Sequence, residues 1–371
     1  MKELADIVTI YKELNRTGKS FALATVVGVT GSTYRRPGAR MLFSEEGRQA
    51  GLINAACLES DLSERARKII ASGKSELIAY DTTSPEDIVF GLGLGCNGTV
   101  EILMESSQSP SVTEKMEIFK RSLSADCPIV LATVVDANAI SGLQPGDYVV
   151  DDNRGSVNGS IGNAGFSGTI ASECRSFKEI PFAQKSLPLA GGQVRVFFET
   201  LSPPLPLVVF GAGPDAIPLV ASAKSLGWNV TVVDHRPAFA TKSNVRSADA
   251  VVLSEPERLA DHLKLSPRHV AVIMTHNFDK DRKLLKYLLS SEVRYVGLLG
   301  PKTKLQTLLQ NLEADGFVPT ELQLAKLYAP IGLDIGAETP EEIAYSIIAE
   351  IKAVLQGRSG GFLKDRKGAI H

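Results

Sequence analysis

The spacing of hydrophobic and polar residues changes once along this chain, near residue 202. Before that point, short apolar runs rich in β-branched residues alternate with turns, which predicts a domain of short strands. The expected strands are Phe21 to Val29, Arg40 to Ser44, Gly51 to Ala56, Leu77 to Tyr80, Ile88 to Phe90 and Val100 to Met104. Apolar residues at helical spacing predict an opening helix that Gly18 ends, and helices at 58–72 and 112–124. A loop rich in Gly, Asn and Ser is expected around 152–170.

After the proline-rich connector at 202–206, fully apolar strands alternate with helices, which predicts a parallel sheet covered on both faces. The expected strands are Pro206 to Phe210, Asn229 to Asp234, Ala250 to Leu253, Val270 to Thr275 and Tyr295 to Leu299. The expected helices are 213–226, 279–289, 301–314 and one from Thr339 to about Gln356 that opens with a capping box. We expect an α/β protein with an α+β domain at 1–201, a Rossmann-like domain at 206–357 and a basic tail at 358–371.

The first domain contains an internal repeat, with copies at about 21–105 and 129–200. Leu23 to Val27 returns as Leu131 to Val135, 108 residues later, and Gly98 to Glu105 aligns with Gly192 to Glu199, 94 residues later. A duplication shares its scaffold between copies, so residues present in only one copy are the better functional candidates. The run Tyr34-Arg35-Arg36 and the segment Asn54 to Glu59 have no counterpart in the second copy.

Composition limits the class of protein. The 371 residues carry a formal net charge of −2, so no overall field favours nucleic acid or an anionic membrane. The 4 cysteines form no C-x-x-C pair, which argues against a disulfide framework or a structural zinc. The opening residues lack the apolar stretch of a signal peptide, and no window is long and apolar enough to span a membrane. We expect a soluble cytoplasmic protein.

A dinucleotide-type fingerprint opens the second domain. The expected strand ending at Phe210 runs into Gly211-Ala212-Gly213, and Asp234 ends the next strand, where an acidic side chain can accept from a ribose hydroxyl. This order of strand, glycine loop, helix and acid predicts a site for NAD(P). The alternative is a turn kept for packing, and the carboxylate of Asp215 beside the phosphate position would repel a pyrophosphate.

Two further residues point to the same crevice. His276 follows an expected parallel strand, at the edge where open α/β sheets bind ligands, and is either a base, a polar contact or a loop-ordering residue. Asp334 lies just before the last helix, where it can face the crevice or only start the helix.

Basic and thiol side chains mark the first domain. Arg35, Arg36 and Arg40 surround a Pro-Gly turn, and their guanidinium forks suit a phosphate or a flat heterocycle, unless the turn is simply solvated. Cys57 and Cys96 lie among small residues, where a thiolate can act as a soft metal ligand or nucleophile, although a lone cysteine is more often buried and inert.

Together these segments resemble the xanthine dehydrogenase accessory factor family, XdhC/CoxI. The resemblance rests on the following segments, in family order: G-S-T-Y-R-R-P-G-A-R-M at 31–41, Cys57-Leu58-Glu59, Leu94-Gly95-Cys96, F-G-A-G-P-D-A at 210–216, V-V-D-H-R-P at 232–237, M-T-H-N at 274–277, Y-V-G-L-L-G at 295–300 and G-L-D-I-G-A-E-T-P-E-E-I-A at 332–344. The chain departs from the family at Asn54-Ala55-Ala56 and at Asn97, where members usually have glycine.

The resemblance implies a cytoplasmic chaperone without turnover of its own. Such a protein binds the molybdopterin form of molybdenum cofactor, holds it while a cysteine desulfurase sulfurates it, and inserts it into a xanthine dehydrogenase-type molybdoenzyme. Arg35, Arg36 and Arg40 would hold the pterin phosphate, Cys57 and Cys96 would contact or guard the metal, and Glu59 belongs to the same motif.

Two other functions remain as alternatives on the sequence alone. One is an NAD(P)-dependent oxidoreductase that uses the Gly211 to Asp234 site with His276 as the acid. The other is a scaffold that binds no cofactor and recruits maturation proteins. Pairing of two copies into a homodimer is also left open.

Overall fold

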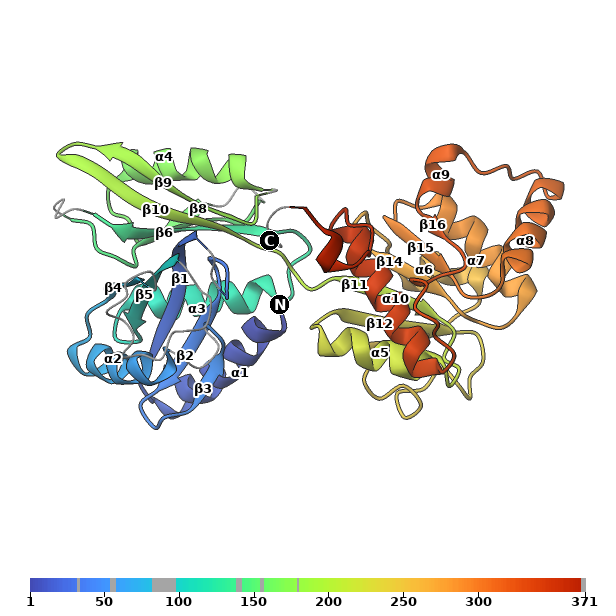
Figure 1. Cartoon of the computed structure of the whole chain (residues 1–371), viewed down its shortest axis with the longest axis horizontal. Coiled ribbons are helices and arrows are strands. Elements are labelled where there is room, and N and C mark those ends of the chain that lie inside the picture. The colour runs from blue at the N-terminus through green and yellow to red at the C-terminus, as the bar shows by residue number, and fades with distance from the viewer. Residues whose placement is uncertain are drawn as a thin grey trace. The chain divides into compact units, whose positions relative to one another are not determined.

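The structure is a computed structural model that describes residues 1–31, 34–53, 58–81, 98–137, 142–153, 157–178 and 180–367. It divides into two compact units, Met1–Pro203 and Pro204–His371, which Figure 1 shows together. The expected strand at 88–90 and both candidate cysteines, Cys57 and Cys96, lie outside the described residues.

The N-terminal unit begins with α1 (Lys2–Thr17), which Gly18 ends in a left-handed conformation with φ 66°. Its first sheet has the antiparallel order β3-β2-β1-β5-β4. The strands are β1 (Phe21–Gly31), β2 (Arg40–Ser44), β3 (Gln49–Gly51), β4 (Glu76–Asp81) and β5 (Gly98–Ser106). The helix α2 (Glu59–Ser72) packs Leu62, Ala66 and Ile69 against one face of this sheet.

The second sheet repeats this order as β8-β7-β6-β10-β9, also antiparallel. Its strands are β6 (Ile129–Asp136), β7 (Tyr148–Asp151), β8 (Val157–Gly159), β9 (Phe182–Leu189) and β10 (Gly192–Leu201). The helix α3 (Pro110–Ser122) precedes it, and α4 (Ala164–Cys174) with the short η2 (Arg175–Phe177) lies between β8 and β9. Matched in chain order, the two sheets are the same, so the predicted internal duplication is confirmed in the fold.

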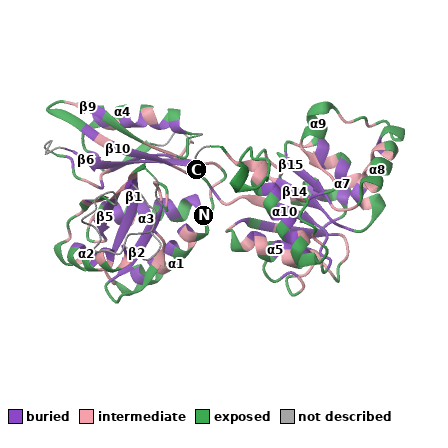
Figure 2. Cartoon of the chain, in the orientation of Figure 1, coloured by how far each residue is buried: buried purple, intermediate pink, exposed green. Residues whose placement is uncertain are grey.

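The two sheets share a small apolar cluster made of equivalent residues. Val27 and Val135 are 108 positions apart, Leu103 and Phe197 are 94 apart, and all four side chains are buried together. A contact in which each copy contributes the same positions is what a two-fold-like relation between the halves produces. Figure 2 shows the buried residues concentrated along β1, β5, β6 and β10.

The C-terminal unit is a parallel sheet of order β13-β12-β11-β14-β15-β16. The strands are β11 (Pro206–Phe210), β12 (Asn229–Asp234), β13 (Ala250–Leu253), β14 (Val270–Ile273), β15 (Tyr295–Leu298) and β16 (Leu327–Tyr328). The helices are α5 (Ala216–Ser225), η3 (Pro256–Arg258), α6 (Leu259–His262), α7 (Phe278–Ser290), α8 (Lys302–Ala314), α9 (Glu321–Ala325), α10 (Pro340–Leu355) and η4 (Leu363–Asp365). Alternate residues of β11 enter opposite cores, with Leu207 and Val209 facing α5 and α10 and Phe210 facing α7 and α8. The predicted fold class is confirmed.

Two sequence predictions of local structure are wrong. In the described part of the strand expected at 51–56, β3 ends at Gly51, whose φ of 90° and close approach to the Arg40 carbonyl exclude a side chain, and Leu52 and Ile53 are not in a strand. The rest of that expected strand, 54–56, lies outside the described residues. The loop expected at 152–170 contains the start of α4, which Asn163 caps by accepting from the Phe166 N–H. Phe166, Ile170 and Cys174 form the buried stripe of this helix, a spacing that the glycines at 165 and 168 obscure in the sequence.

Candidate functional site

The strands next to three candidate segments share a direction in the first sheet. β1 and β3 run in one direction because both are antiparallel to β2, and β5 runs in the opposite direction to β1. In the sequence, Arg35 and Arg36 follow β1, Cys57 follows β3 and Cys96 precedes β5. Gly31, the last residue of β1, pairs with Gly98, the first residue of β5, whereas Gly51, the last residue of β3, lies level with Ala24. The ends of β1 and β5 therefore meet, and Cys57 and Cys96 themselves lie outside the described residues.

The helix α2 begins two residues after Cys57, and no side chain caps its first N–H groups. Free N–H groups and the positive end of a helix dipole lower the pKa of a nearby thiol. Glu59 is the first residue of this helix and is half-buried. The remaining acid of the first turn, Asp61, is neutralised by Arg65, whose Nε lies 2.7 Å from the carboxylate. This helix end suits a thiolate.

The three arginines differ in their contacts. Arg35 donates from both terminal nitrogens to Glu3, at 2.6 Å and 2.5 Å. Arg40 is only 7% exposed, forms a buried ion pair with Glu199, and donates to the Gly38 carbonyl at 2.9 Å. Arg36 is exposed, and its guanidinium has no ion pair with the part of the chain that the structure describes. Of the three, Arg36 has the fork that no described carboxylate occupies.

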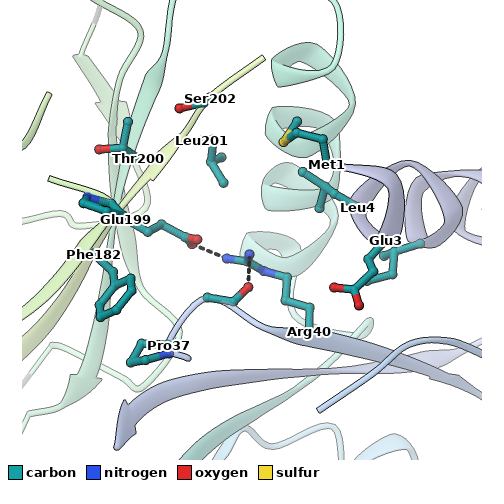
Figure 3. A pocket seen from close by; sticks show the side chains of 13 residues that line it. Met1, Glu3, Leu4, Pro37, Arg40, Phe182, Glu199, Thr200, Leu201 and Ser202 are labelled. Atoms are coloured by element: carbon teal, nitrogen blue, oxygen red, sulfur yellow. Dashed lines mark hydrogen bonds and ion pairs between the residues drawn. The ribbon is translucent and has the colours of Figure 1, made fainter. Parts of the chain in front are cut away.

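A cavity of about 260 Å³ opens between the start of α1, the Pro37-Gly38 turn and the end of β10 (Figure 3). Arg40, Glu3 and Glu199 line it, together with apolar groups that include Phe182. The Nε atom of Arg40 is buried and has no hydrogen-bond partner within the described residues. Arg35 is connected to this cavity by its hydrogen bonds to Glu3, which lines it. Sequence reasoning missed Glu3, Phe182 and Glu199, although the repeat marks Glu199 as the equivalent of Glu105.

The glycine loop of the C-terminal unit is built for close packing. Gly211 has φ 113°, and an added Cβ there would overlap the Met274 carbonyl, just after the neighbouring strand β14. A Cβ on Gly213 would lie 2.8 Å from Oδ1 of Asp215, the end of a side chain. Gly211 is therefore required by the backbone of the chain itself, whereas Gly213 is in contact only with a side chain that can move.

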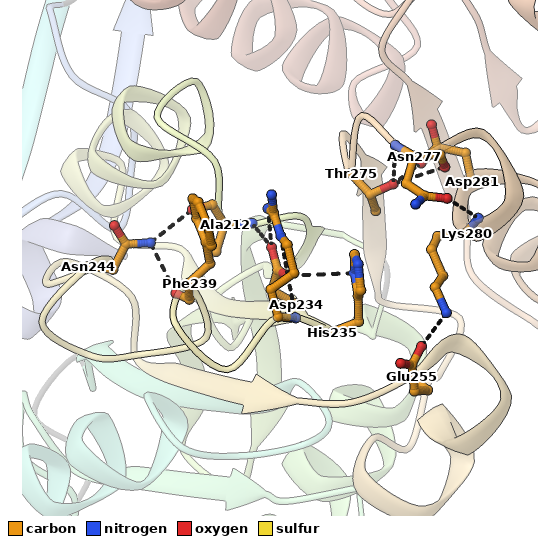
Figure 4. Close-up of polar contacts among 11 residues, drawn as sticks. Ala212, Asp234, His235, Phe239, Asn244, Glu255, Thr275, Asn277, Lys280 and Asp281 are labelled. Carbon is orange, nitrogen blue, oxygen red and sulfur yellow. Dashed lines mark hydrogen bonds and ion pairs between the residues drawn. The ribbon is translucent and has the colours of Figure 1, made fainter.

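Asp234 holds this loop in place (Figure 4). Its Oδ2 accepts from the Ala212 N–H at 2.7 Å and from Arg236 Nη2 at 2.8 Å, and its Oδ1 accepts from the Arg236 N–H at 2.8 Å and Nε at 3.0 Å. Burial disfavours the charged carboxylate, but the hydrogen bonds from Arg236 and Ala212 outweigh it and lower the pKa of Asp234. The side chain is 1% exposed, so its oxygens serve the fold.

His276 and Asp215 meet at the point where the strand order reverses, between β11 and β14. His276 has φ 54°, and its Nε2 lies 2.7 Å from Oδ2 of Asp215. The imidazole is 63% exposed and the Asp215 side chain 19% exposed. Asp334 is exposed beside the start of α10 and makes no hydrogen bond or ion pair with any residue that the structure describes, so no described contact links it to this pair.

A buried acid below the crevice was not predicted. Asp281 is 0% exposed, accepts from Thr275 Oγ1 at 2.5 Å, and lies 2.5 Å from Lys304 Nζ. Lys304 also donates to the Leu299 carbonyl at 2.9 Å. These contacts join the loops after β14 and β15. In the sequence, nothing distinguishes Asp281 from an ordinary acidic residue in the first turn of a helix.

No metal cluster is present among the described residues, where no group of three or more His, Cys, Asp or Glu side chains is arranged to hold an ion. Two cysteines are described: Cys127 is half-buried, and burial raises the pKa of Cys174 to about 12. The helices that the structure describes include none with the length and apolar character needed to cross a membrane.

The chain joins a unit of two antiparallel sheets of the same strand order to a Rossmann-type parallel unit, which defines a two-part α/β protein. Family models agree: residues 14–81 match the model described as XdhC and CoxI family, and residues 207–351 match the XdhC Rossmann domain. The chain belongs to the XdhC and CoxI family.

Individual relatives extend over most of the chain. It is 32% identical over 329 residues to a Bacillus subtilis protein described as a probable xanthine dehydrogenase subunit, covering 89% of this chain and 91% of that protein. It is 22% identical over 339 residues to the molybdenum cofactor insertion chaperone PaoD of Escherichia coli, covering 91% of this chain and 84% of that one. A crystal structure described as a xanthine dehydrogenase from Bacillus halodurans is similar with a TM-score of 0.77 and 31% identity, covering 95% of this chain and 96% of that chain.

Proposed function

We propose that this protein binds molybdenum cofactor, protects it during sulfuration and inserts it into a xanthine dehydrogenase-type molybdoenzyme. The observation that carries the proposal is the pairing of the end of β1, which the arginines follow in the sequence, with the start of β5, which Cys96 precedes. Family membership and the likeness to an insertion chaperone support it. In this role the protein delivers a cofactor and has no catalytic turnover.

The cysteines supply soft ligands for the metal of the cargo. Molybdenum accepts thiolate sulfur, and Cys57 just before α2 is placed, by sequence, at a helix end that favours the thiolate. Cys96 precedes Gly98, the first residue of β5, by two residues in the sequence. Glu59, the first residue of α2, bounds this site on its helical side. The two thiols contact or guard the metal while sulfur is exchanged.

The arginines recognise the phosphate of the pterin. Arg36 offers a guanidinium fork that no described carboxylate fills. Arg35 and Arg40 are already paired with Glu3 and Glu199. Of these four residues, Arg40, Glu3 and Glu199 line the cavity. Arg40 Nε is buried without a described partner, and an acceptor oxygen of the ligand in the cavity would satisfy it.

Delivery requires two partners of different kinds. A cysteine desulfurase supplies the sulfur, and the apo-molybdoenzyme takes the cofactor when it docks. No specific feature of the described residues favours the alternative of an NAD(P)-dependent oxidoreductase, because Asp234 is buried and His276 is paired with Asp215.

Cofactor content tests the proposal directly. The protein is co-produced with the cofactor pathway, and molybdenum is measured by elemental analysis together with fluorescence of the oxidised pterin. We expect near-stoichiometric cofactor in the parent protein and its loss in Cys57→Ala and Cys96→Ala. Cys127→Ala is the matched control, since this half-buried thiol lies in the second copy near the Asp152 carbonyl. A parent protein without pterin, or equal loss in the control, would contradict the proposal.

A further inference from the structure

The C-terminal unit has the fold that commonly binds dinucleotides, so its loop can be compared with what a pyrophosphate needs. Such a ligand needs close approach to the second glycine, free N–H groups at the start of the following helix, and an accessible acid for the ribose. Each of these three features is present in the sequence of this chain. The structure shows that each is already used internally.

The surface above the second glycine is covered by a carboxylate of the chain. Oδ1 of Asp215 lies 2.8 Å from the position that a Cβ on Gly213 would take, so the oxygen occupies the space that a missing side chain leaves. Oδ2 of the same carboxylate is bound to His276 at 2.7 Å. An anion thus already lies where a bound pyrophosphate would lie, and a second anion would be repelled.

Four N–H groups of the loop and of the helix start are also committed, whereas those of Gly213 and Asp215 donate to no described residue. The N–H groups of Gly211, Ala212, Ala216 and Ile217 donate to Val233, Asp234, Gly213 and Pro214 respectively. Pro214 has no N–H to offer. The Ala212 carbonyl accepts from Asn244 Nδ2 at 2.8 Å, which fixes the loop from its other side. The helix end therefore lacks most of the donors that hold phosphates in dinucleotide-binding proteins.

The acid that would bind a ribose is buried. Asp234 receives four hydrogen bonds from Ala212 and Arg236, and its side chain is 1% exposed. Its carboxylate cannot accept from a ribose hydroxyl unless Arg236 leaves. The committed donors and the buried acid share the Ala212–Asp234 hydrogen bond, whereas the Asp215 carboxylate is a separate obstacle.

We propose that the Rossmann-type unit is closed to dinucleotides by its own Asp215, whose carboxylate replaces the pyrophosphate and ties the loop after β11 to His276 after β14. The contact between Asp215 and His276 then holds these two loops in a fixed position. This inference does not depend on whether the N-terminal unit carries molybdenum cofactor.

Calorimetric titration of the full chain tests this inference. The probes are NADH, NADPH, ADP and inorganic pyrophosphate, each added to the parent protein and to Asp215→Ala and Asp215→Asn. The parent should bind none of them saturably below about 1 mM. Both variants remove the negative charge, and we expect their affinity for pyrophosphate or ADP to rise at least about tenfold above that of the parent. Glu313→Gln, which removes an exposed carboxylate from α8, is the control and should resemble the parent.

Two results would overturn the inference. One is micromolar binding of NADH or NADPH by the parent protein. The other is a folded Asp215→Ala variant, checked by circular dichroism and by the fluorescence of Trp228, that binds pyrophosphate and ADP no better than the parent does. Neither result bears on pterin content, so failure here is distinguishable from failure of the proposed function.

Discussion

Glu105 and Glu199 lie at equivalent positions of the two sheets, and each forms a buried ion pair with a cation from the opposite half. Glu105 of the first half pairs with Lys115 of α3, and Glu199 of the second half pairs with Arg40 of β2. Lys115 also donates to the Gly146 carbonyl at 3.0 Å and Arg40 to the Gly38 carbonyl at 2.9 Å, two glycines that the repeat aligns. The duplication thus preserves the acids and turns but takes the two cations from different elements. Arg40 places a guanidinium at the cavity wall.

The Arg40–Glu199 pair should stabilise the N-terminal unit strongly. Replacing Glu199 by Ala leaves a buried guanidinium unpaired, which should cost about 3 to 5 kcal/mol of unfolding free energy. Replacing both residues, as Arg40→Met with Glu199→Leu, should cost less than the single change because no buried charge remains. Urea unfolding followed by far-ultraviolet circular dichroism measures both. The single tryptophan, Trp228, reports the C-terminal unit and should show an unchanged transition.

The control for this pair is an exposed one. Asp261→Asn removes the partner of Arg258 at the surface and should change stability by less than about 0.5 kcal/mol. A Glu199→Ala protein as stable as the parent would show that the buried pair contributes nothing to holding the halves together.

The two glycines of the loop after β11 should respond differently to alanine. Gly211→Ala places a methyl group against the Met274 carbonyl at φ 113°, and should destabilise the C-terminal unit by roughly 3 kcal/mol. Gly213→Ala meets only the end of the Asp215 side chain, which can turn away, and should cost about 1 kcal/mol or less. Denaturant unfolding monitored by Trp228 fluorescence compares them. Equal costs would contradict the assignment of Gly211 to strand packing.

The stabilising effect of Asp234 should disappear in acid. Its pKa is lowered in the folded protein by hydrogen bonds from Arg236 and Ala212, so folding favours the ionised form. The stability it adds is complete above its unfolded pKa of about 3.9 and is lost as the pH falls through the lower, folded value. Asp234→Asn should therefore be less stable than the parent at pH 7 by about 2 kcal/mol, with a difference that shrinks below about pH 4. A difference independent of pH would show that ionisation of Asp234 does not matter.

The structural features that depend on residues close together in the sequence were predicted from the sequence. The bounds of β11 followed from an uninterrupted apolar run and those of β12 from a run rich in valine, and the Thr339 to Glu342 capping box at α10 was predicted and observed. The partner of Arg40 could not be predicted in this way, because Glu199 is 159 residues away and only the packing of the two sheets joins them. Asp215 was suspected of repelling a pyrophosphate, but its bond to His276 depends on a left-handed residue in a loop, for which the sequence carries no signal.

Comparing Arg36 with its neighbour Arg35 tests which arginine would bind the phosphate of the proposed pterin ligand. Arg36 is exposed and unpaired among the described residues, whereas Arg35 is bound to Glu3 by two hydrogen bonds. If the proposed function holds, Arg36→Ala removes a charge-assisted contact worth about 1.5 to 3 kcal/mol, so pterin affinity should fall roughly tenfold to a hundredfold. Lys120→Ala, an exposed cation on α3, is the control for loss of positive charge. Titration of each variant with purified cofactor, read by pterin fluorescence, gives the affinities. Equal affinities for Arg36→Ala and Lys120→Ala would contradict the assignment of the phosphate contact to Arg36.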